Sequence, residues 1–192
     1  LIAGTFIIGR QINYMLNKDL GFEKEAIIYF YVPWRAPKEN KQRLTNELEK
    51  LPAVQMISRH QSPPAANGYN SSSYKFDANG EQIEQSLHRK DMDENYLDLY
   101  GIELIAGREL LPSDTIREYI VNEKLVKVMG LDTPEEAIGK TLAQGETTGF
   151  PIVGVVKDFH QQSLKEEIAP VVMGMNTYGN CFSIKLNTMG KS

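Results

Sequence analysis

The sequence has little of what disulfide bonding or nucleic-acid binding requires. Only one of its 192 residues, Cys181, is a cysteine, so no disulfide can form within the chain and zinc sites built from several cysteines are excluded. The formal net charge is -4, which argues against binding to the phosphate backbone of nucleic acids. Because 41% of the residues are hydrophobic, the chain can still bury a core, as one domain or two small lobes.

Histidine is also scarce. His60, His88 and His160 lie far apart in the sequence, so the helical histidine pair of a metalloprotease is missing. Asp158 and His160 share one face if they continue a strand, and a nearby glutamate can approach them. We favour a hydrogen-bonded loop histidine over a metal ligand at this position.

Motifs of catalytic or nucleotide-binding sites are incomplete. Ser72 and Lys75 fit the Ser-x-x-Lys pattern, but the pattern is short and a polar loop explains it better. Residues 139–141 (Gly-Lys-Thr) end like a phosphate-binding loop, yet Pro134 stands where that loop needs its first glycine. Cys181 falls in a predicted strand, where a buried and inert thiol is expected. We therefore expect a protein that is not an enzyme, with no cofactor or metal in this domain.

No hydrophobic run is long enough to cross a bilayer, which takes roughly 20 residues. The first nine residues are nearly uncharged and end at Arg10, but they lack the starting methionine and the basic region of a secretory signal peptide. From the residues alone they are either the outer end of a transmembrane helix or an ordinary buried helix end. Apolar residues at helical spacing extend the predicted helix over residues 5–20, which we call the stalk.

The most informative stretch runs from Phe150 to Pro170. Its first half is a β-branched apolar run, typical of a strand that is buried on both faces, and Gly154 within it indicates a bulge or a close approach of backbone. Ser163 followed by Glu166 makes a capping box, which predicts a short helix that ends before Pro170.

The same stretch, Gly-Val-Val-Lys-Asp-Phe-His-Gln-Gln-Ser-Leu-Lys-Glu-Glu-Ile-Ala-Pro (154–170), resembles the end of the MacB-like periplasmic core domain of FtsX-like ABC transporter permeases. Two further stretches match in the same order: residues 11–22 (Gln-Ile-Asn-Tyr-Met-Leu-Asn-Lys-Asp-Leu-Gly-Phe), and residues 100–108 followed by Val-Asn-Glu at 121–123. The resemblance spans nearly the whole chain. Its motif near the end is carried by Gly154, Val155, Lys157, Asp158, Phe159 and His160.

The resemblance implies an extracytoplasmic domain of the bacterial inner membrane that faces the periplasm. It favours the membrane interpretation of the first residues and implies that membrane helices flank the domain. ATP hydrolysis then belongs to a separate cytoplasmic ABC subunit or domain, and a second permease copy completes a dimer. A periplasmic adaptor and an outer-membrane channel are further partners that the resemblance allows.

Pattern and resemblance together predict an α/β (α+β) fold with two lobes. Strands over residues 26–32 and 54–59 enclose a helix that begins near Pro37 and shows one apolar face, which makes a β-α-β unit. We assign residues 1–24 to the membrane helix end and stalk. Residues 25–61 and 168–192 form a porter-like core lobe, and residues 62–167 form an inserted, β-rich lobe. This arrangement brings both ends of the domain to one side.

Several local signals fall within these lobes. The Asn79-Gly80 turn predicts a hairpin, Asn122 is the expected cap of a helix over residues 123–129, and Thr133 opens a second capping box. Strands at 171–175 and 181–186 are expected to close the chain as a pair. The better-known exporters of the family have a helix between their last two strands, whereas a five-residue turn stands here, so the core lobe is expected to be trimmed.

Three functional hypotheses remain. In the leading one, the domain is a non-catalytic part of a permease that passes the motion of the membrane helices to the envelope, with Leu16 and Leu20 coupling the stalk. Trp34 and Tyr69 are candidate partner contacts, although core capping explains Trp34 as well. The alternative is a ligand-binding or sensing module whose groove between the lobes captures a peptide or lipid. A hydrolase, the third hypothesis, requires Asp158, His160 and a carboxylate or serine to converge in one pocket.

Overall fold

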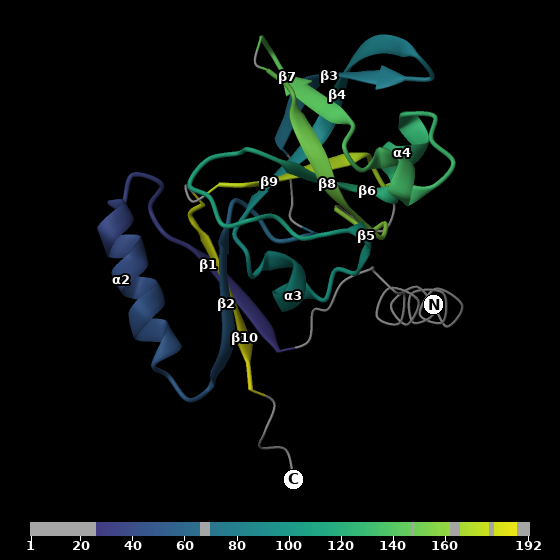
Figure 1. The fold of residues 1–192 in the computed structure, drawn as a ribbon. Coiled ribbons are helices and arrows are strands. Elements are labelled where there is room, and N and C mark those ends of the chain that lie inside the picture. Colours follow the sequence, from purple (N-terminus) through teal and green to yellow (C-terminus); the bar gives the residue numbers. More distant parts are fainter. Residues whose placement is uncertain (1–25, 66–69, 147, 162–165, 177–178, 188–192) are drawn as a thin grey trace, which may run out of the picture.

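The computed structural model describes residues 26–65, 70–146, 148–161, 166–176 and 179–187. The predicted stalk with Leu16 and Leu20, the loop residue Tyr69 and the helix start at Ser163 all lie outside these residues. Among the described residues, no helix is both long and apolar enough to cross a membrane. Two sheets make up the domain, a small one that carries α2 and a large one to which α4 belongs (Figure 1).

Strands dominate the described chain and the helices are short, which confirms an α+β fold. The elements in chain order are β1 (Ile27–Tyr31), α2 (Lys38–Glu49), β2 (Val54–His60), β3 (Asn70–Ala78), β4 (Glu81–Met92), α3 (Tyr96–Tyr100), β5 (Leu104–Gly107), β6 (Tyr119–Asn122), α4 (Glu123–Val128), the 3₁₀ helix η1 (Pro134–Ala137), β7 (Thr141–Gln144), β8 (Phe150–Val156), β9 (Val171–Met175) and β10 (Cys181–Leu186).

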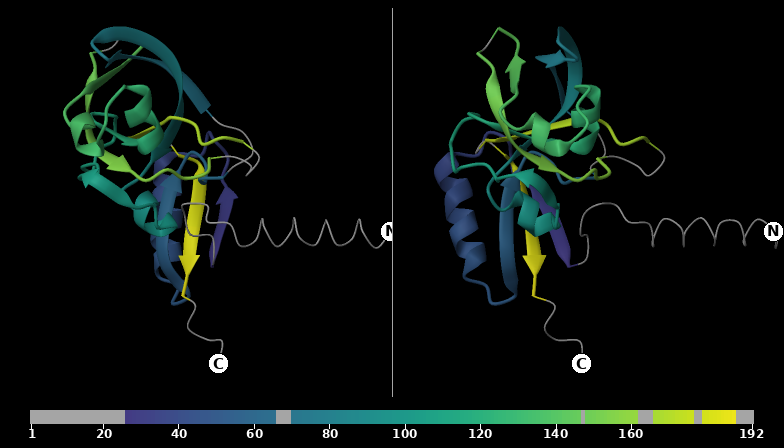
Figure 2. Two further views of the ribbon diagram at one scale, coloured as in Figure 1. Left: turned by 90° about the vertical axis from the view of Figure 1, so that its right-hand side faces the viewer. Right: turned by 45° about the vertical axis from the view of Figure 1, so that its right-hand side comes forward.

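The small sheet has the strand order β1-β10-β2, with antiparallel pairing throughout. The β-α-β unit is therefore split, because β10 lies between the two strands that α2 connects. Leu44 and Leu48 of α2 pack on a cluster formed by Ile57, Phe182 and Ile184. The residue before β1 lies next to the last residue of β10, since the Leu186 amide donates to the Ala26 carbonyl at 2.9 Å. Figure 2 shows α2 along one face of the small sheet.

The large sheet has the order β5-β8-β6-β9-β4-β3-β7, and β7 pairs with β8 as well. One edge of β8 pairs with β6, and the other is shared by β7 and β5. Six strands, β8-β6-β9-β4-β3-β7, thus close into a barrel-like ring. Its core is apolar and includes Tyr74, Phe76, Leu87, Tyr119 and Val121, all at most 2% exposed.

Two local predictions in the large sheet are confirmed. β3 and β4 form a long hairpin whose turn residues Asn79 and Gly80 have φ of 56° and 85°, the left-handed values that a tight two-residue turn requires. The Asn122 side chain caps α4 by accepting from the Leu125 amide at 3.3 Å.

Two other predictions are wrong. β9 and β10 do not pair: β9 lies in the large sheet between β4 and β6, while β10 returns to the small sheet. Both strands are apolar, so periodicity could not tell which sheet each would join. The division at residue 168 therefore places β9 in the wrong lobe. Thr133 makes no capping hydrogen bond at η1; Glu136 instead accepts from the Asp132 amide at 3.2 Å.

Candidate functional site at the junction of the two sheets

The two sheets meet where β2 ends, and α3 fills the space between them. Asn95, just before α3, donates from Nδ2 to the Ile57 carbonyl on β2 at 2.8 Å, and the Gln61 amide donates to the Asp91 carbonyl on β4 at 3.0 Å. A shared apolar cluster extends across the junction, from Ile27 and Met56 of the small sheet to the buried residues of α3, β8 and β9. The interface between the lobes is therefore packed.

A buried hydrogen-bond chain joins β2, β10 and α3 within this packing. His60 Nε2 lies 2.8 Å from Ser183 Oγ, which lies 2.6 Å from the hydroxyl of Tyr100. The His60 ring also packs edge-on against Tyr96, at 4.9 Å between centroids. Burial lowers the pKa of His60 to about 3, and the nearby charge of Lys90 adds to this, so the imidazole is neutral at physiological pH.

Asp93 ties the same strand to the start of α3. Its carboxylate accepts from Ser58 Oγ at 2.6 Å and from the Arg59 amide. Burial is the largest influence and raises the pKa of Asp93 to about 6, although these two hydrogen bonds act in the opposite direction. Ser58, which donates to Asp93, and His60 are alternate residues of β2, so the acidic group and the neutral histidine lie on the same side of the strand, toward α3.

Lys90 anchors residues 62–64, which follow β2. Its ammonium group donates to Ser62 Oγ at 3.1 Å and to the carbonyls of Pro63 and Pro64 at 2.8 and 3.2 Å. Burial lowers the pKa of Lys90 to about 8. Since all three ammonium hydrogens have acceptors, this buried charge is satisfied and holds residues 62–64 in place.

A cavity of about 360 Å³ opens beside this packed junction. Its floor is the large sheet, where Arg89 and Asp91 lie two residues apart on β4, and its other wall comes from the loops at the end of the small sheet. Arg89 forms a bidentate salt bridge with Asp91, in which Nε donates to Oδ1 at 2.7 Å and Nη2 donates to Oδ2 at 3.0 Å. The lining is Trp34, Gln61, Asn70, Ser71, Ser72, Arg89, Asp91, Asn176 and Gly179.

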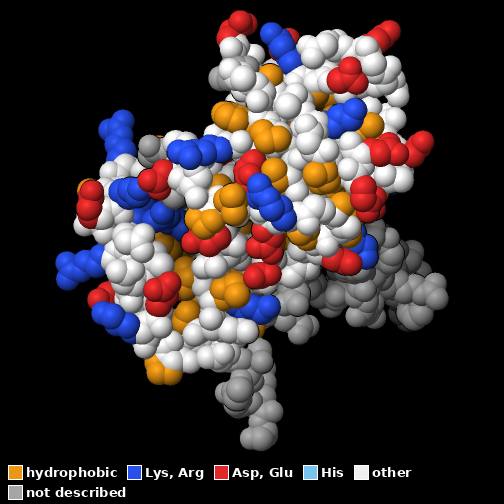
Figure 3. Space-filling view, in the orientation of Figure 1, with side chains coloured by type: hydrophobic (Ala, Val, Ile, Leu, Met, Phe, Trp, Pro, Cys, Tyr) orange, Lys and Arg blue, Asp and Glu red, His pale blue; other side chains and the backbone are white. Residues whose placement is uncertain are grey.

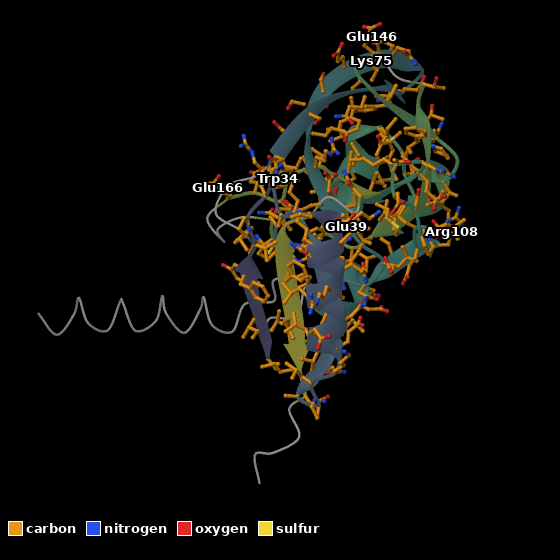
Figure 4. All side chains as sticks on the ribbon, turned by 90° about the vertical axis from the view of Figure 1, so that its left-hand side faces the viewer. Trp34, Glu39, Lys75, Arg108, Glu146 and Glu166 are labelled. Carbon is orange, nitrogen blue, oxygen red and sulfur yellow. The ribbon has the colours of Figure 1, made fainter. Side chains whose placement is uncertain are left out.

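Trp34, predicted from the sequence as a partner contact, lies at the rim of this cavity. Figure 4 shows it at the level where the small sheet gives way to the large one. Its side chain is 57% exposed, so it does not cap the core. Lys41 lies over the indole ring, 5.7 Å from its centroid, and donates to the Trp34 carbonyl at 3.3 Å. A role in partner contact stays a prediction.

The family-like motif lies elsewhere, at the end of β8. A side chain at Gly154 would place its Cβ 2.4 Å from the Arg108 carbonyl oxygen, which explains the glycine by the close backbone approach that the sequence indicated. Val155 and Phe159 are fully buried, whereas Lys157 is exposed and forms an ion pair with Glu103 at 3.5 Å.

Asp158 has a structural position within this motif. Its carboxylate accepts from Asn122 Nδ2 at 2.8 Å and from the Lys124 amide at 2.9 Å, so it holds the start of α4. The Asp158 amide in turn donates to Glu123 at 2.9 Å. Asp158 and His160 are not among the residues that line the cavity described above. Within the described ranges, no group of three or more histidine, cysteine or acidic side chains is placed to hold a metal ion.

The other sequence candidates are separated in the structure. Ser72 and Lys75 are three residues apart on β3 and therefore point to opposite faces of the strand. Lys140 belongs to the turn before β7, where the Gly139 amide donates to the Ile152 carbonyl at 2.8 Å. Cys181 is fully buried, and burial raises its pKa to about 11, which fits the inert thiol expected there.

Sequence reasoning missed the residues that form the junction. His60 and Ser183 are 123 positions apart, and Ser58 and Asp93 are 35 apart, so no local pattern links them. The one usable signal was the polar pair Ser58 and His60 on alternate positions of a short strand, which places both side chains on one face.

Comparisons with known proteins bear on the whole fold. No protein-family model matches the sequence, and no curated protein matches it significantly. Among solved structures, the chain is similar to the periplasmic region of MacB from Actinobacillus actinomycetemcomitans, with a TM-score of 0.59 and 16% identity over 93% of this chain and 82% of that one. It is also similar to the extracellular domain of the noncanonic ABC-type transporter YknZ from Gram-positive bacteria, with a TM-score of 0.56 and 14% identity over 85% of this chain and 84% of that one. The chain therefore has the fold of a MacB-like extracytoplasmic domain of an ABC transporter permease, as the resemblance implied.

Proposed function

We propose that the chain is the extracytoplasmic domain of a bacterial ABC transporter permease and that it transmits the motion of membrane helices without catalysis. The likeness to MacB and YknZ supports the first part. In this proposal the domain faces the periplasm, and a cytoplasmic ABC ATPase drives a dimer of permease copies. A periplasmic adaptor or an outer-membrane channel would receive the motion.

The packed junction is the observation that carries the transmission role. A domain that relays motion needs its two sheets to move together, and the junction provides apolar packing across α3 together with the buried chain from His60 through Ser183 to Tyr100. A groove for a lipid would need an open apolar cleft instead, whereas the cavity beside the junction is lined mainly by polar side chains.

The adjacency of the first and last strands supports the same role. Ala26 and Leu186 are hydrogen-bonded neighbours at one end of the small sheet. A movement of the chain that precedes β1 therefore pulls on the end of the hydrogen-bonded pair of strands β1 and β10. That pair then passes the movement to the rest of the small sheet. Leu16 and Leu20 remain our candidates for the residues that couple this end to the membrane.

Spin labels on the two lobes of the full-length protein in membranes test rigid transmission. Asn46→Cys on α2 and Lys127→Cys on α4 are both exposed, while the native Cys181 is buried and stays unlabelled. The doubly labelled chain is mixed with an excess of unlabelled chain, so that most dimers carry labels on one copy only. Pulsed electron resonance should then give one narrow distance between the two lobes of that copy, the same with ADP and with trapped ATP. A distance that changes with nucleotide would show a hinge between the lobes and would overturn rigid transmission.

A second measurement tests coupling through the stalk. With only Asn46→Cys labelled, the distance between the two copies should change on ATP binding. Leu16→Gly with Leu20→Gly should abolish that change while ATP hydrolysis persists, because glycine makes a helix flexible. The matched control is Leu16→Ala with Leu20→Ala, which removes the same side chains but keeps helix propensity. If the glycine variant behaves like the alanine variant, these positions do not couple the stalk. Failure of any ATPase subunit or domain to co-purify would contradict the permease assignment itself.

A further inference from the structure

We infer that the cavity between the two sheets binds a neutral saccharide of one or two sugar residues. The volume of about 360 Å³ lies in the lower part of the range for small-molecule sites, which begins at roughly 300 Å³. Both sheets contribute to the cavity, with the floor on β3 and β4 and the opposite wall on the loops that follow β1 and β2.

The lining offers groups that both donate and accept hydrogen bonds. These are the side-chain amides and hydroxyls of Gln61, Asn70, Ser71, Ser72 and Asn176. Sugar hydroxyls have the same dual character, so each can pair with an amide or hydroxyl in either direction. Among the described lining residues only Trp34 brings a large apolar surface, which disfavours an acyl chain as the occupant.

The charges on the floor cancel, which favours a neutral ligand. Asp91 is 8% exposed, and its carboxylate receives two hydrogen bonds from Arg89 and a longer one from Asn176 at 3.4 Å. Two of the five guanidinium N–H groups of Arg89 are used in this way. The others make no further hydrogen bond to the described residues, so they can donate to neutral ring or hydroxyl oxygens while Asp91 compensates the charge.

One buried atom in the lining needs a donor. Gln61 Oε1 is inaccessible to solvent and accepts no hydrogen bond from the described residues. Leaving such an oxygen buried without a donor is unfavourable. Gln61 lines the cavity, so a rotation of its side-chain amide brings Oε1 within reach of a ligand hydroxyl, and the hydrogen bond formed on binding removes this cost.

Trp34 supplies the face on which a sugar ring can pack. The C–H groups on one side of a pyranose ring are apolar and pack flat against aromatic rings, while the hydroxyls at its edge reach polar groups. The indole is 57% exposed, and Lys41, which donates to the Trp34 carbonyl, helps to hold this segment against α2. An aromatic wall beside a floor of amides, hydroxyls and a paired guanidinium is therefore suited to a saccharide.

Trp34 is the only tryptophan of the chain, so its fluorescence reports directly on this cavity. The experiment titrates the 192-residue chain with diacetylchitobiose, cellobiose and maltose and follows tryptophan emission. We expect at least one of these probes to give a saturable change below about 10 mM. Gln61→Ala and Asn70→Ala should each weaken that binding about tenfold, the effect of losing one good hydrogen bond in the site.

Ser73→Ala is the matched control, because Ser73 Oγ donates to Glu84 at 2.7 Å and Ser73 does not line the cavity. It should leave the affinity unchanged, and circular dichroism should show all three variants folded. Three outcomes would overturn the inference: no saturable response to any of the three saccharides, equal affinity in Gln61→Ala and the native chain, or tighter binding of glucuronate or a glycine-rich tripeptide than of any neutral sugar. None of these outcomes affects the spin-label tests of transmission.

Discussion

The two sheets of the domain differ in whether their edge strands are paired. In the large sheet β7 reaches across to β8 and the ring of strands closes, whereas in the small sheet β1 keeps one edge without a partner strand among the described residues. Five of the eight large apolar side chains that are exposed in the described part of the chain lie on or just after this strand: Ile28, Tyr29, Phe30, Tyr31 and Trp34.

This difference indicates that the small sheet, rather than the large one, is suited to contact with another chain. A closed ring buries its apolar residues and satisfies its own backbone groups, while an apolar free edge invites contact with another chain. The basic side chains are also unevenly distributed over the surface, since many of them lie on the side of the molecule that carries α2 (Figure 3). We expect the ring to contribute most of the stability and the small sheet to contribute less.

The largest effect should come from the core of the ring. Phe76 on β3 is 1% exposed, and Phe76→Ala should lower the free energy of unfolding by about 3–5 kcal/mol because it leaves a cavity. Phe30 on β1 is 36% exposed and stacks on Phe182 at 5.5 Å, so Phe30→Ala should cost only about 1 kcal/mol. Urea unfolding of both variants measures the difference. Equal losses would show that the small sheet is as tightly packed as the ring.

The junction between the two sheets should respond to pH through two opposed groups. The folded pKa of Asp93, about 6, lies above its ordinary value near 4, so stability falls as pH rises from about 4 to 6. The folded pKa of His60, about 3, lies below its ordinary value near 6.5, so stability rises as pH rises from about 3 to 6.5. The two contributions nearly cancel between about pH 4 and 6.

Removing either group should reveal the pH dependence of stability that the other one causes. In Asp93→Asn the free energy of unfolding should rise by about 3 kcal/mol more than in the native protein between pH 4 and 6. In His60→Gln the free energy of unfolding should instead fall as pH rises from about 4 to 6, because only Asp93 then contributes. Denaturant unfolding at several pH values provides the measurement. Parallel pH profiles for the native protein and both variants would mean that neither group is shielded as the structure indicates.

A smaller effect is expected where β5 pairs with β8 beside the ring. Gly154→Ala should cost about 2 kcal/mol, because its Cβ would meet the Arg108 carbonyl oxygen and the two strands would have to move apart. Gly149→Ala, whose nearest contact would be Thr141 Cβ at 3.2 Å, should cost less than about 1 kcal/mol. Thermal unfolding distinguishes the two, and similar values for both would contradict the close approach.

The free edge of β1 should be visible without any mutation. Ala26 and Val32 pair with β10 through hydrogen bonds, so the alternation of an antiparallel ladder points the amides of Ile27, Tyr29 and Tyr31 to the open side. In the 192-residue chain these three amides should exchange with deuterium much faster than those of Ile28, Phe30 and Val32. Slow exchange at all six would show that another strand covers the edge.

Much of the fold could be predicted from local signals. The strand and helix around Pro37, the Asn79-Gly80 hairpin and the Asn122 cap depend on residues that are neighbours in sequence, so their chemistry could be recognised there. The placement of β9 could not be predicted, because an apolar strand fits either sheet and only its partners decide. The cavity likewise combines Trp34, Arg89 and Asn176, which no sequence spacing connects.

By itself, the sequence determined the α+β class, most of the strands and the likeness to permease domains, because periodicity, turn residues and motif order are local properties of a chain. Only the tertiary structure decided that β7 closes the large ring, that β10 rather than β9 completes the small sheet, and that His60, Ser183 and Tyr100 meet at the junction. The physical reason is that strand pairing and burial depend on contacts between distant residues, and their energies are fixed only once the whole chain has packed.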